Sequence, residues 1–130
     1  MRLQAYTEYA IRILQYLHVH RIGLQSGVRI AEETGVSYQA FMMIAVQLRR
    51  AGLLISVRGP GGGFQLGRPA EEISFYDVFL CIEKELCISR NLNGEEPASD
   101  PDYKVHEFLR DWQDKMVEEM SGKTIAELAS

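Results

Sequence analysis

The chain has 130 residues, of which 46% are hydrophobic and 25% are charged, so we expect one soluble globular domain with a substantial core. No run approaches the roughly 18 apolar residues of a membrane span and no leader-like segment opens the chain, so we expect a cytoplasmic protein without a membrane role. The two cysteines, Cys81 and Cys87, are too few for a disulfide framework or a four-ligand zinc site.

The net charge of −4 conceals two halves of opposite sign. Residues 1–70 hold eight arginines against three glutamates, a net charge of +5. Residues 71–130 hold six basic and fifteen acidic side chains, a net charge of −9. Arginine is well suited to phosphate and guanine, so we expect only the first half to face nucleic acid.

Two helices joined by a tight turn are predicted near the start of the chain. Tyr6 to His20 has helical periodicity, with one apolar face made of Tyr6, Tyr9, Ala10, Ile13, Leu14 and Leu17. Arg21 to Gly27 is a polar, glycine-containing loop, and Val28 to Thr34 is a short helix ended by Gly35. The next helix begins after Ser37, only two residues beyond Gly35. The helix over Val28–Thr34 and this next helix therefore have the form of a helix-turn-helix.

The stretch from Ser37 to Pro69 predicts a helix followed by a hairpin. Ser37 is a suitable N-cap, and an apolar stripe of Phe41, Ile44, Ala45 and Leu48 follows it. Ala51–Gly52 ends the helix, and two β-prone runs, 53–57 and 64–66, flank a glycine-rich turn. A helix that leads into such a hairpin is typical of a winged helix-turn-helix, although an ordinary helix–hairpin pair with solvated arginines fits the same pattern.

The side of this helix opposite the apolar stripe is the predicted DNA-reading surface. Gln39 can present its amide to an adenine edge, and Arg58 at the hairpin tip can reach a phosphate or a narrow minor groove. Met43 either touches thymine methyl groups or packs against the first helix. The full predicted interface is Ser37, Tyr38, Gln39, Met43, Arg49, Arg50, Arg58, Gly59 and Gly61.

The acidic half predicts three further helices. Ser74 to Asp77 has the form of a capping box, which predicts a helix from Phe75 to Glu85 with Cys81 as a small core residue. Residues 89–102 form a loop, a long helix runs over residues 102–120, and Thr124 caps a last short helix. The long helix carries an apolar stripe that is either intramolecular core or a dimer seam: Val105, Phe108, Leu109, Trp112 and Met116.

With these elements in place, the sequence resembles the Rrf2 family of bacterial winged-helix regulators, the IscR, NsrR and CymR type. The matching segments are MRLQAYTEYAIRIL, IAEETGVSYQAF, LRRAGLL, VRGPGGGFQL, RPAEEISFYDV and TIAELAS. The resemblance implies a mainly α fold with a small β-hairpin: a winged helix-turn-helix domain (1–85), then a loop, a dimerisation helix and a C-terminal helix (86–130). It also implies a homodimer that grips double-stranded DNA.

Many members of the family hold a [2Fe–2S] or [4Fe–4S] cluster through three cysteines, and here this chain departs from the pattern. Asn91 and Tyr103 stand where the first and last of those cysteines are expected. Glu8 and His106 match ligand positions of relatives, although His106 is most simply a solvated or interface residue. Clusters are held by thiolates, so we predict no metal and no cofactor.

The sequence therefore predicts a homodimeric regulator, a repressor, that binds a palindromic operator without a cluster and responds to a small-molecule effector or a protein partner. One alternative is an iron–sulfur or redox-sensing regulator ligated by Glu8, Cys87 and His106. A second is a protein-interaction module that docks an enzyme. No catalytic motif is present, so an enzyme is not expected.

Overall fold

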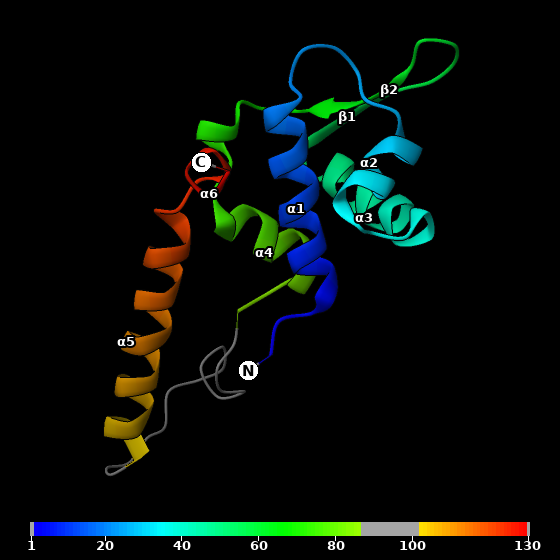
Figure 1. Ribbon diagram of the computed structural model, residues 1–130. Coiled ribbons are helices and arrows are strands. Elements are labelled where there is room, and N and C mark those ends of the chain that lie inside the picture. Colours follow the sequence, from blue (N-terminus) through cyan, green and yellow to red (C-terminus); the bar gives the residue numbers. More distant parts are fainter. Residues whose placement is uncertain (1, 87–101, 130) are drawn as a thin grey trace.

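The computed structural model describes residues 2–86 and 102–129, and it is mainly helical with one two-stranded antiparallel sheet (Figure 1). Cys87, Asn91 and most of the predicted loop lie outside the described residues. The elements are α1 (Ala5–Val19), α2 (Gly27–Thr34), α3 (Tyr38–Arg50), β1 (Leu54–Val57), β2 (Gly63–Leu66), the 3-10 turn η1 (Ala70–Glu72), α4 (Phe75–Glu83), α5 (Asp102–Ser121) and α6 (Ile125–Leu128).

Side-chain caps fix the starts of three helices in the way that the sequence predicts. The hydroxyl of Ser37 accepts the backbone N–H of Ala40 at 3.1 Å, and Ser74 and Asp77 form both bonds of a capping box. Thr124 caps α6 by accepting from the N–H of Glu127. Such caps satisfy donors that the first helical turn leaves free, so they define where the helices begin.

The core lies between α1, α3, α4 and the base of the hairpin. Ile13, Leu14, Phe41, Ile44 and Leu48 are fully buried there. Two predicted core residues differ, because Tyr6 and Tyr9 are only partly covered whereas Thr7 is completely buried. The polar side chain of Thr7 is tolerated because its hydroxyl donates to the carboxylate of Glu83, at the end of α4.

The prediction that α4 extends to Glu85 is wrong, since the helix ends at Glu83. Lys84 leaves the helix with φ 77°, and its ammonium group turns back to donate to the carbonyl of Cys81 at 2.9 Å. The Glu83 carboxylate accepts from the backbone N–H of Gln4 at 2.9 Å, which fastens it to the start of α1. Lys84 also donates to the side-chain oxygen of Gln47 in α3 at 3.2 Å, so the end of α4 is bonded to both α1 and α3.

The last helix, α6, packs onto the winged part of the molecule. Ile125 is fully buried, and its backbone N–H donates to the carbonyl of Ile73 at 2.8 Å. Ser74 and Thr124 form an isolated antiparallel bridge, and the amide of Gln15 donates to the carbonyl of Leu128. Helix α6 is therefore held against α1 and η1, which fixes the C-terminal end of α5, while α5 itself contacts α4 and lies to one side of the other helices (Figure 1).

None of the helices within residues 2–86 and 102–129 has the length and apolar character that crossing a membrane requires.

Candidate nucleic-acid interface

The outer face of α3 exposes the polar and basic residues that the sequence places there. Ser37, Tyr38 and Gln39 are exposed at its start, and Arg49 and Arg50 are exposed at its end. The buried stripe of the same helix faces the core, so these side chains point to solvent. About three turns of helix that expose an amide at one end and guanidinium groups at the other can read base edges and contact backbone phosphates.

An aromatic cluster holds the hairpin against α3. The rings of Phe41 and Phe64 meet edge to face, with centroids 5.0 Å apart, and Tyr38 stacks on Phe41 at 6.4 Å. Phe64 also forms an isolated two-bond bridge with Gln25, in the loop before α2, which ties that loop to β2. Because these contacts are close-packed, the wing and α3 keep a fixed spacing.

A shallow groove of about 260 Å³ separates α3 from the wing. Arg49 of α3 and Arg58 beyond β1 both line it, and Met42, Val46 and Ser56 complete its walls. Two guanidinium groups from different elements thus share one exposed groove, which suits a phosphate or a narrow minor groove. Met42 and Ser56 are absent from the predicted interface, although helical spacing puts Met42 beside Val46 and Arg49.

Met43 lies at the edge of the predicted face that is nearest to α1. Its side chain is half exposed, and the hydroxyl of Tyr6 in α1 lies 3.6 Å from its sulfur atom. Met43 thus contacts the first helix and still exposes about half of its surface, so a contact with thymine methyl groups stays a prediction.

The tip of the wing turns through two glycines in the left-handed region. Gly59 has φ 94° and Gly61 has φ 76°, values that residues with a Cβ atom rarely adopt. A Cβ atom on Gly62 would lie 2.2 Å from the carbonyl oxygen of Val57, inside the turn. The exposed tip thus presents Arg58 next to bare backbone, which permits a close approach to a ligand.

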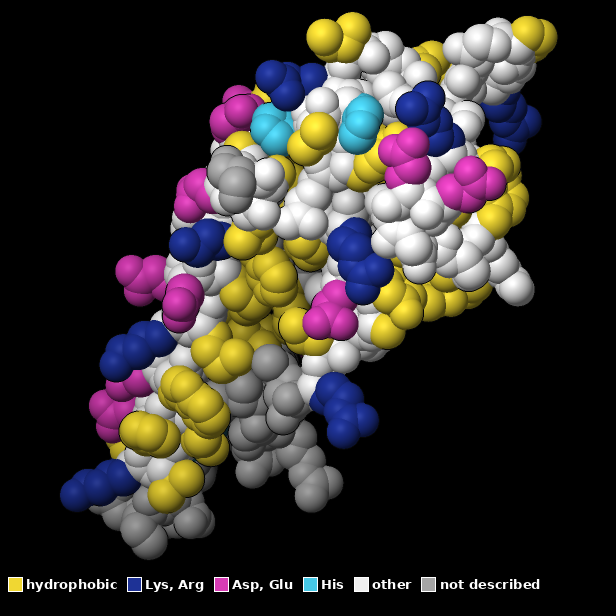
Figure 2. Space-filling view, in the orientation of Figure 1, with side chains coloured by type: hydrophobic (Ala, Val, Ile, Leu, Met, Phe, Trp, Pro, Cys, Tyr) yellow, Lys and Arg dark blue, Asp and Glu magenta, His cyan; other side chains and the backbone are white. Residues whose placement is uncertain are grey.

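The α5 helix carries the largest exposed apolar side chains of the acidic half (Figure 2). Val105, Phe108 and Trp112 are 60%, 66% and 50% exposed. At 3.6 residues per turn they fall within about 60° of one another, so they form one stripe. Leu109 and Met116, also predicted for the seam, are half-buried beside it.

His106 lies on the opposite flank of α5 and is only 5% exposed, so the expectation of a solvated residue is wrong. Its Nε2 atom lies 2.9 Å from Nη2 of Arg110. A guanidinium group can only donate, so Nε2 is the acceptor in this contact. One of the two ring nitrogens that a metal could use is therefore already engaged by a cation.

Within residues 2–86 and 102–129, no group of three or more His, Cys, Asp or Glu side chains could hold a metal ion. Cys81 is half-buried, and burial raises the pKa of its thiol, with Lys84 lowering it by a smaller amount. Since metal clusters need thiolates, this cysteine is a poor ligand. Glu8 is exposed, and Cys87 lies outside the described residues. The described residues thus do not fit an iron site.

The comparisons with known proteins agree with this architecture. The sequence profile of the Rrf2 family, described as iron-dependent transcriptional regulators, matches residues 3–130. Protein aau3 of Rhizobium meliloti is 38% identical over 96 residues, which cover 74% of this chain and 62% of that protein. The HTH-type transcriptional regulator IscR of Pectobacterium atrosepticum is 29% identical over 131 residues, which cover 100% of this chain and 80% of IscR.

The fold is also that of a solved regulator. CymR (YrzC), the global cysteine regulator of Bacillus subtilis, superimposes with a TM-score of 0.80 over 99% of this chain and 96% of CymR, at 24% identity. The chain thus combines a helix-turn-helix, a basic wing and a long C-terminal helix with a family match over nearly its whole length. It belongs to the Rrf2 family of winged helix-turn-helix transcriptional regulators, which are DNA-binding proteins and not enzymes.

Proposed function

We propose that the protein is a homodimeric repressor that binds a palindromic operator. The observation that carries this proposal is the groove that Arg49 of α3 and Arg58 of the wing both line, on a helix that exposes the amide of Gln39 at its other end. In this arrangement α3 lies in the major groove, where Gln39 reads a base edge, while the wing reaches the adjacent backbone or minor groove. Repression follows where the operator overlaps a promoter, because bound protein excludes the polymerase.

The remaining predicted contacts have positioning roles in this proposal. Ser37 and Tyr38 at the start of α3, and Arg50 at its end, contact phosphates on either side of the base that Gln39 reads. Gly59 and Gly61 let the backbone of the wing tip approach the DNA. Met42 and Val46, which line the groove, and the half-exposed Met43 supply apolar contacts to thymine methyl groups.

The exposed stripe of α5 supports the dimer. Aromatic side chains as exposed as Phe108 and Trp112 are costly to leave in water, and a second copy of the same stripe would cover them. The acidic residues of the same helix stay at the rim, where they keep this half of the molecule away from phosphates.

We propose further that operator binding needs no iron–sulfur cluster, because the described donor residues do not fit one. The sequence has only two cysteines, burial raises the pKa of the Cys81 thiol, and the imidazole of His106 already accepts from Arg110. A small molecule or a protein partner then supplies the signal.

The experiment is selection of bound fragments from genomic DNA by protein purified anaerobically, followed by anisotropy titrations across salt. We expect a palindromic consensus, binding by a colourless protein, and affinity that falls steeply as salt rises. If the protein retains DNA without any preference for sequence, the proposal of a specific operator is overturned. If it retains no DNA at all, the result favours a protein-interaction module. A visible absorbance that is required for binding would overturn the cluster-free proposal.

A further inference from the structure

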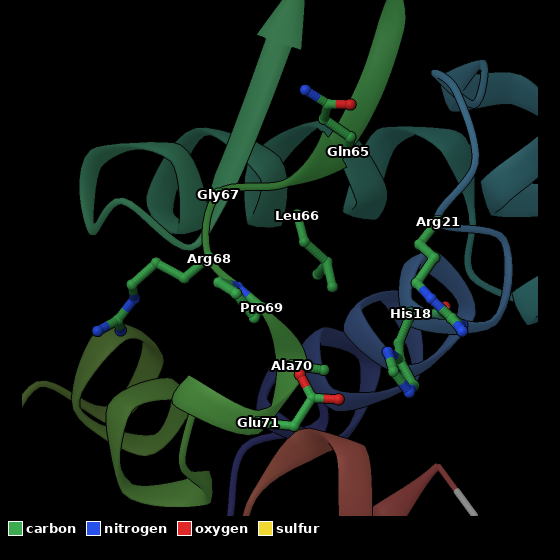
Figure 3. Close-up of a pocket in the computed structure, with 9 residues that line it drawn as sticks. All are labelled: His18, Arg21, Gln65, Leu66, Gly67, Arg68, Pro69, Ala70 and Glu71. Atoms are coloured by element: carbon green, nitrogen blue, oxygen red, sulfur yellow. The ribbon is translucent and has the colours of Figure 1, made fainter.

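We propose that a cavity at the base of the wing binds a small zwitterion of the amino-acid class. The cavity has a volume of about 450 Å³ and lies between the end of α1, the end of β2 and η1 (Figure 3). Nothing in the proposed DNA interface uses it, since it opens at the end of the hairpin opposite the tip. Its volume is at the small end of ligand pockets, which span roughly 300–1,000 Å³.

Arg21 and Glu71 face this cavity without pairing with each other. Arg21 and His18 lie along one wall, and Glu71 lies on another (Figure 3). Arg68 also lines the cavity, but its guanidinium group pairs with the carboxylate of Asp77 at 3.4 Å. Arg21 uses one guanidinium N–H to donate to the carbonyl of His18 at 2.9 Å, which holds the side chain against that wall. Within the described part of the chain, no hydrogen bond or ion pair engages the carboxylate of Glu71.

Three apolar side chains line the cavity between these charges. Leu66 points into the space between the two walls in Figure 3, and Pro69 and the buried Ala70 also line it. Gln65 and Gly67 add an amide and bare backbone to the lining. A ligand that matches all three features carries a carboxylate for Arg21, an ammonium group for Glu71 and a small carbon body between them. A dicarboxylate would repel Glu71 and a simple amine would repel Arg21, so the cavity favours a zwitterion over either.

Close packing links the cavity to the DNA-binding elements. Gly67 follows Leu66, and a Cβ atom on it would lie 2.3 Å from the carbonyl oxygen of Gly52, directly after α3. The backbone N–H of Gly67 donates to the carbonyl of Leu53 at 3.0 Å. The end of β2 is therefore locked to the end of α3. A ligand that presses on Leu66 and Pro69 would displace the wing and α3 together, which makes the cavity suited to an effector.

The test is thermal unfolding of the full chain, without DNA, in the presence of each of the twenty proteinogenic amino acids. A ligand that binds only the folded state raises Tm in a concentration-dependent, saturable way. We expect such a rise with at least one amino acid. We expect Arg21→Met and Glu71→Gln each to weaken that ligand at least tenfold. Both side chains are exposed, so the variants should unfold like the wild type in the absence of ligand.

Glu72→Gln is the matched control, because Glu72 belongs to the same 3-10 turn but does not line the cavity. This variant should keep the wild-type ligand affinity. The proposal is overturned if no amino acid gives a saturable rise up to about 10 mM, well above a millimolar Kd, or if all three variants bind equally. The amino acid that binds is then added to an operator titration. If it leaves operator affinity unchanged, the binding site is supported and its coupling to the wing is overturned. Because ligand binding is measured without DNA, this test is independent of the proposed operator.

Discussion

Helices α3 and α5 both expose apolar side chains, yet the two helices carry net charges of opposite sign. On α3, which exposes Met42 and Met43, the only charged residues are Arg49 and Arg50, and the nearby wing adds Arg58. On α5, which exposes Phe108 and Trp112, six acidic residues outnumber three basic ones. Apolar exposure is therefore not enough to identify a partner. The surrounding charge separates a surface suited to a polyanion from one suited to a second protein chain.

Replacing Trp112 with alanine gives the largest expected effect, because it removes the centre of the α5 stripe. Trp112 is half exposed in the single chain, so the change should cost little folding stability, whereas interface hot spots are worth about 2 kcal/mol or more. We expect the dimer to weaken at least roughly 30-fold, and operator affinity to collapse because two half-sites are no longer held together.

Sedimentation velocity across a dilution series measures this effect. Asp111→Ala, next to Trp112 but acidic and exposed, should leave the mass unchanged. A Trp112→Ala protein that only melts earlier, with a mass independent of concentration, would place the stripe in the intramolecular core. A wild-type protein that is monomeric at micromolar concentration would remove the dimer without any variant.

Replacing Gln39 with alanine tests base reading on the other surface. We expect a loss of about 1–3 kcal/mol for the operator and a much smaller loss for random DNA, because only the operator offers a matching base edge. Anisotropy titrations with the two DNAs at one salt concentration measure the difference. Equal losses on both would assign Gln39 to backbone positioning.

Replacing Arg58 with alanine separates phosphate contact from base reading. Since each neutralised phosphate releases bound cations, we expect operator and random DNA to weaken alike and the logarithmic salt slope to fall by about one. Lys123→Ala removes a positive charge from the acidic half and should leave the slope unchanged. If only operator binding weakens, Arg58 reads a base or the groove width instead.

Replacing Glu83 with glutamine should give the smallest effect, and it should fall on stability alone. The carboxylate accepts from the Gln4 backbone and the buried Thr7 hydroxyl, and hydrogen bonds to charged groups contribute about 1.5–3 kcal/mol, of which an amide keeps a part. We expect urea unfolding to show a loss of about 1 kcal/mol, with the mass and the salt slope unchanged. A change in the mass or in the salt slope would contradict this and would mean that Glu83 affects the dimer surface on α5 or the DNA surface on α3.

The sequence predicts most of the fold because its signals are local. Ser37, Ser74 and Thr124 mark helix starts through their own hydroxyls, and Gly59 marks the wing through its backbone. Features that depend on distant partners were not predictable. Lys84 leaves α4 where its neighbour Glu83 binds the start of α1, and Phe64 pairs with Gln25 across the fold.

In the candidate interface, too, local sequence patterns predict some features, and tertiary packing determines the others. Helical periodicity identifies the exposed face of α3, so every predicted contact residue from Ser37 to Gly61 is exposed. Periodicity cannot show what lies beside that face. Met43 reaches Tyr6 of α1, and Ser56 enters the groove from β1, because of tertiary packing alone. The apolar periodicity of α5 likewise does not predict that His106 is buried in contact with Arg110.

The docking of α6 also has a consequence for the DNA itself. Ile125 and the Ser74–Thr124 bridge fix the root of α5, so in the proposed dimer the crossing of two α5 helices sets the distance between the two α3 helices. The distance between the two α3 helices fixes the spacing between the two operator half-sites that the dimer can bind. An operator lengthened by about five base pairs would turn one half-site to the far side of the duplex, since one turn takes about 10 base pairs. The docking of α6, which lies outside the proposed DNA interface, would thus determine which half-site spacings the dimer can bind.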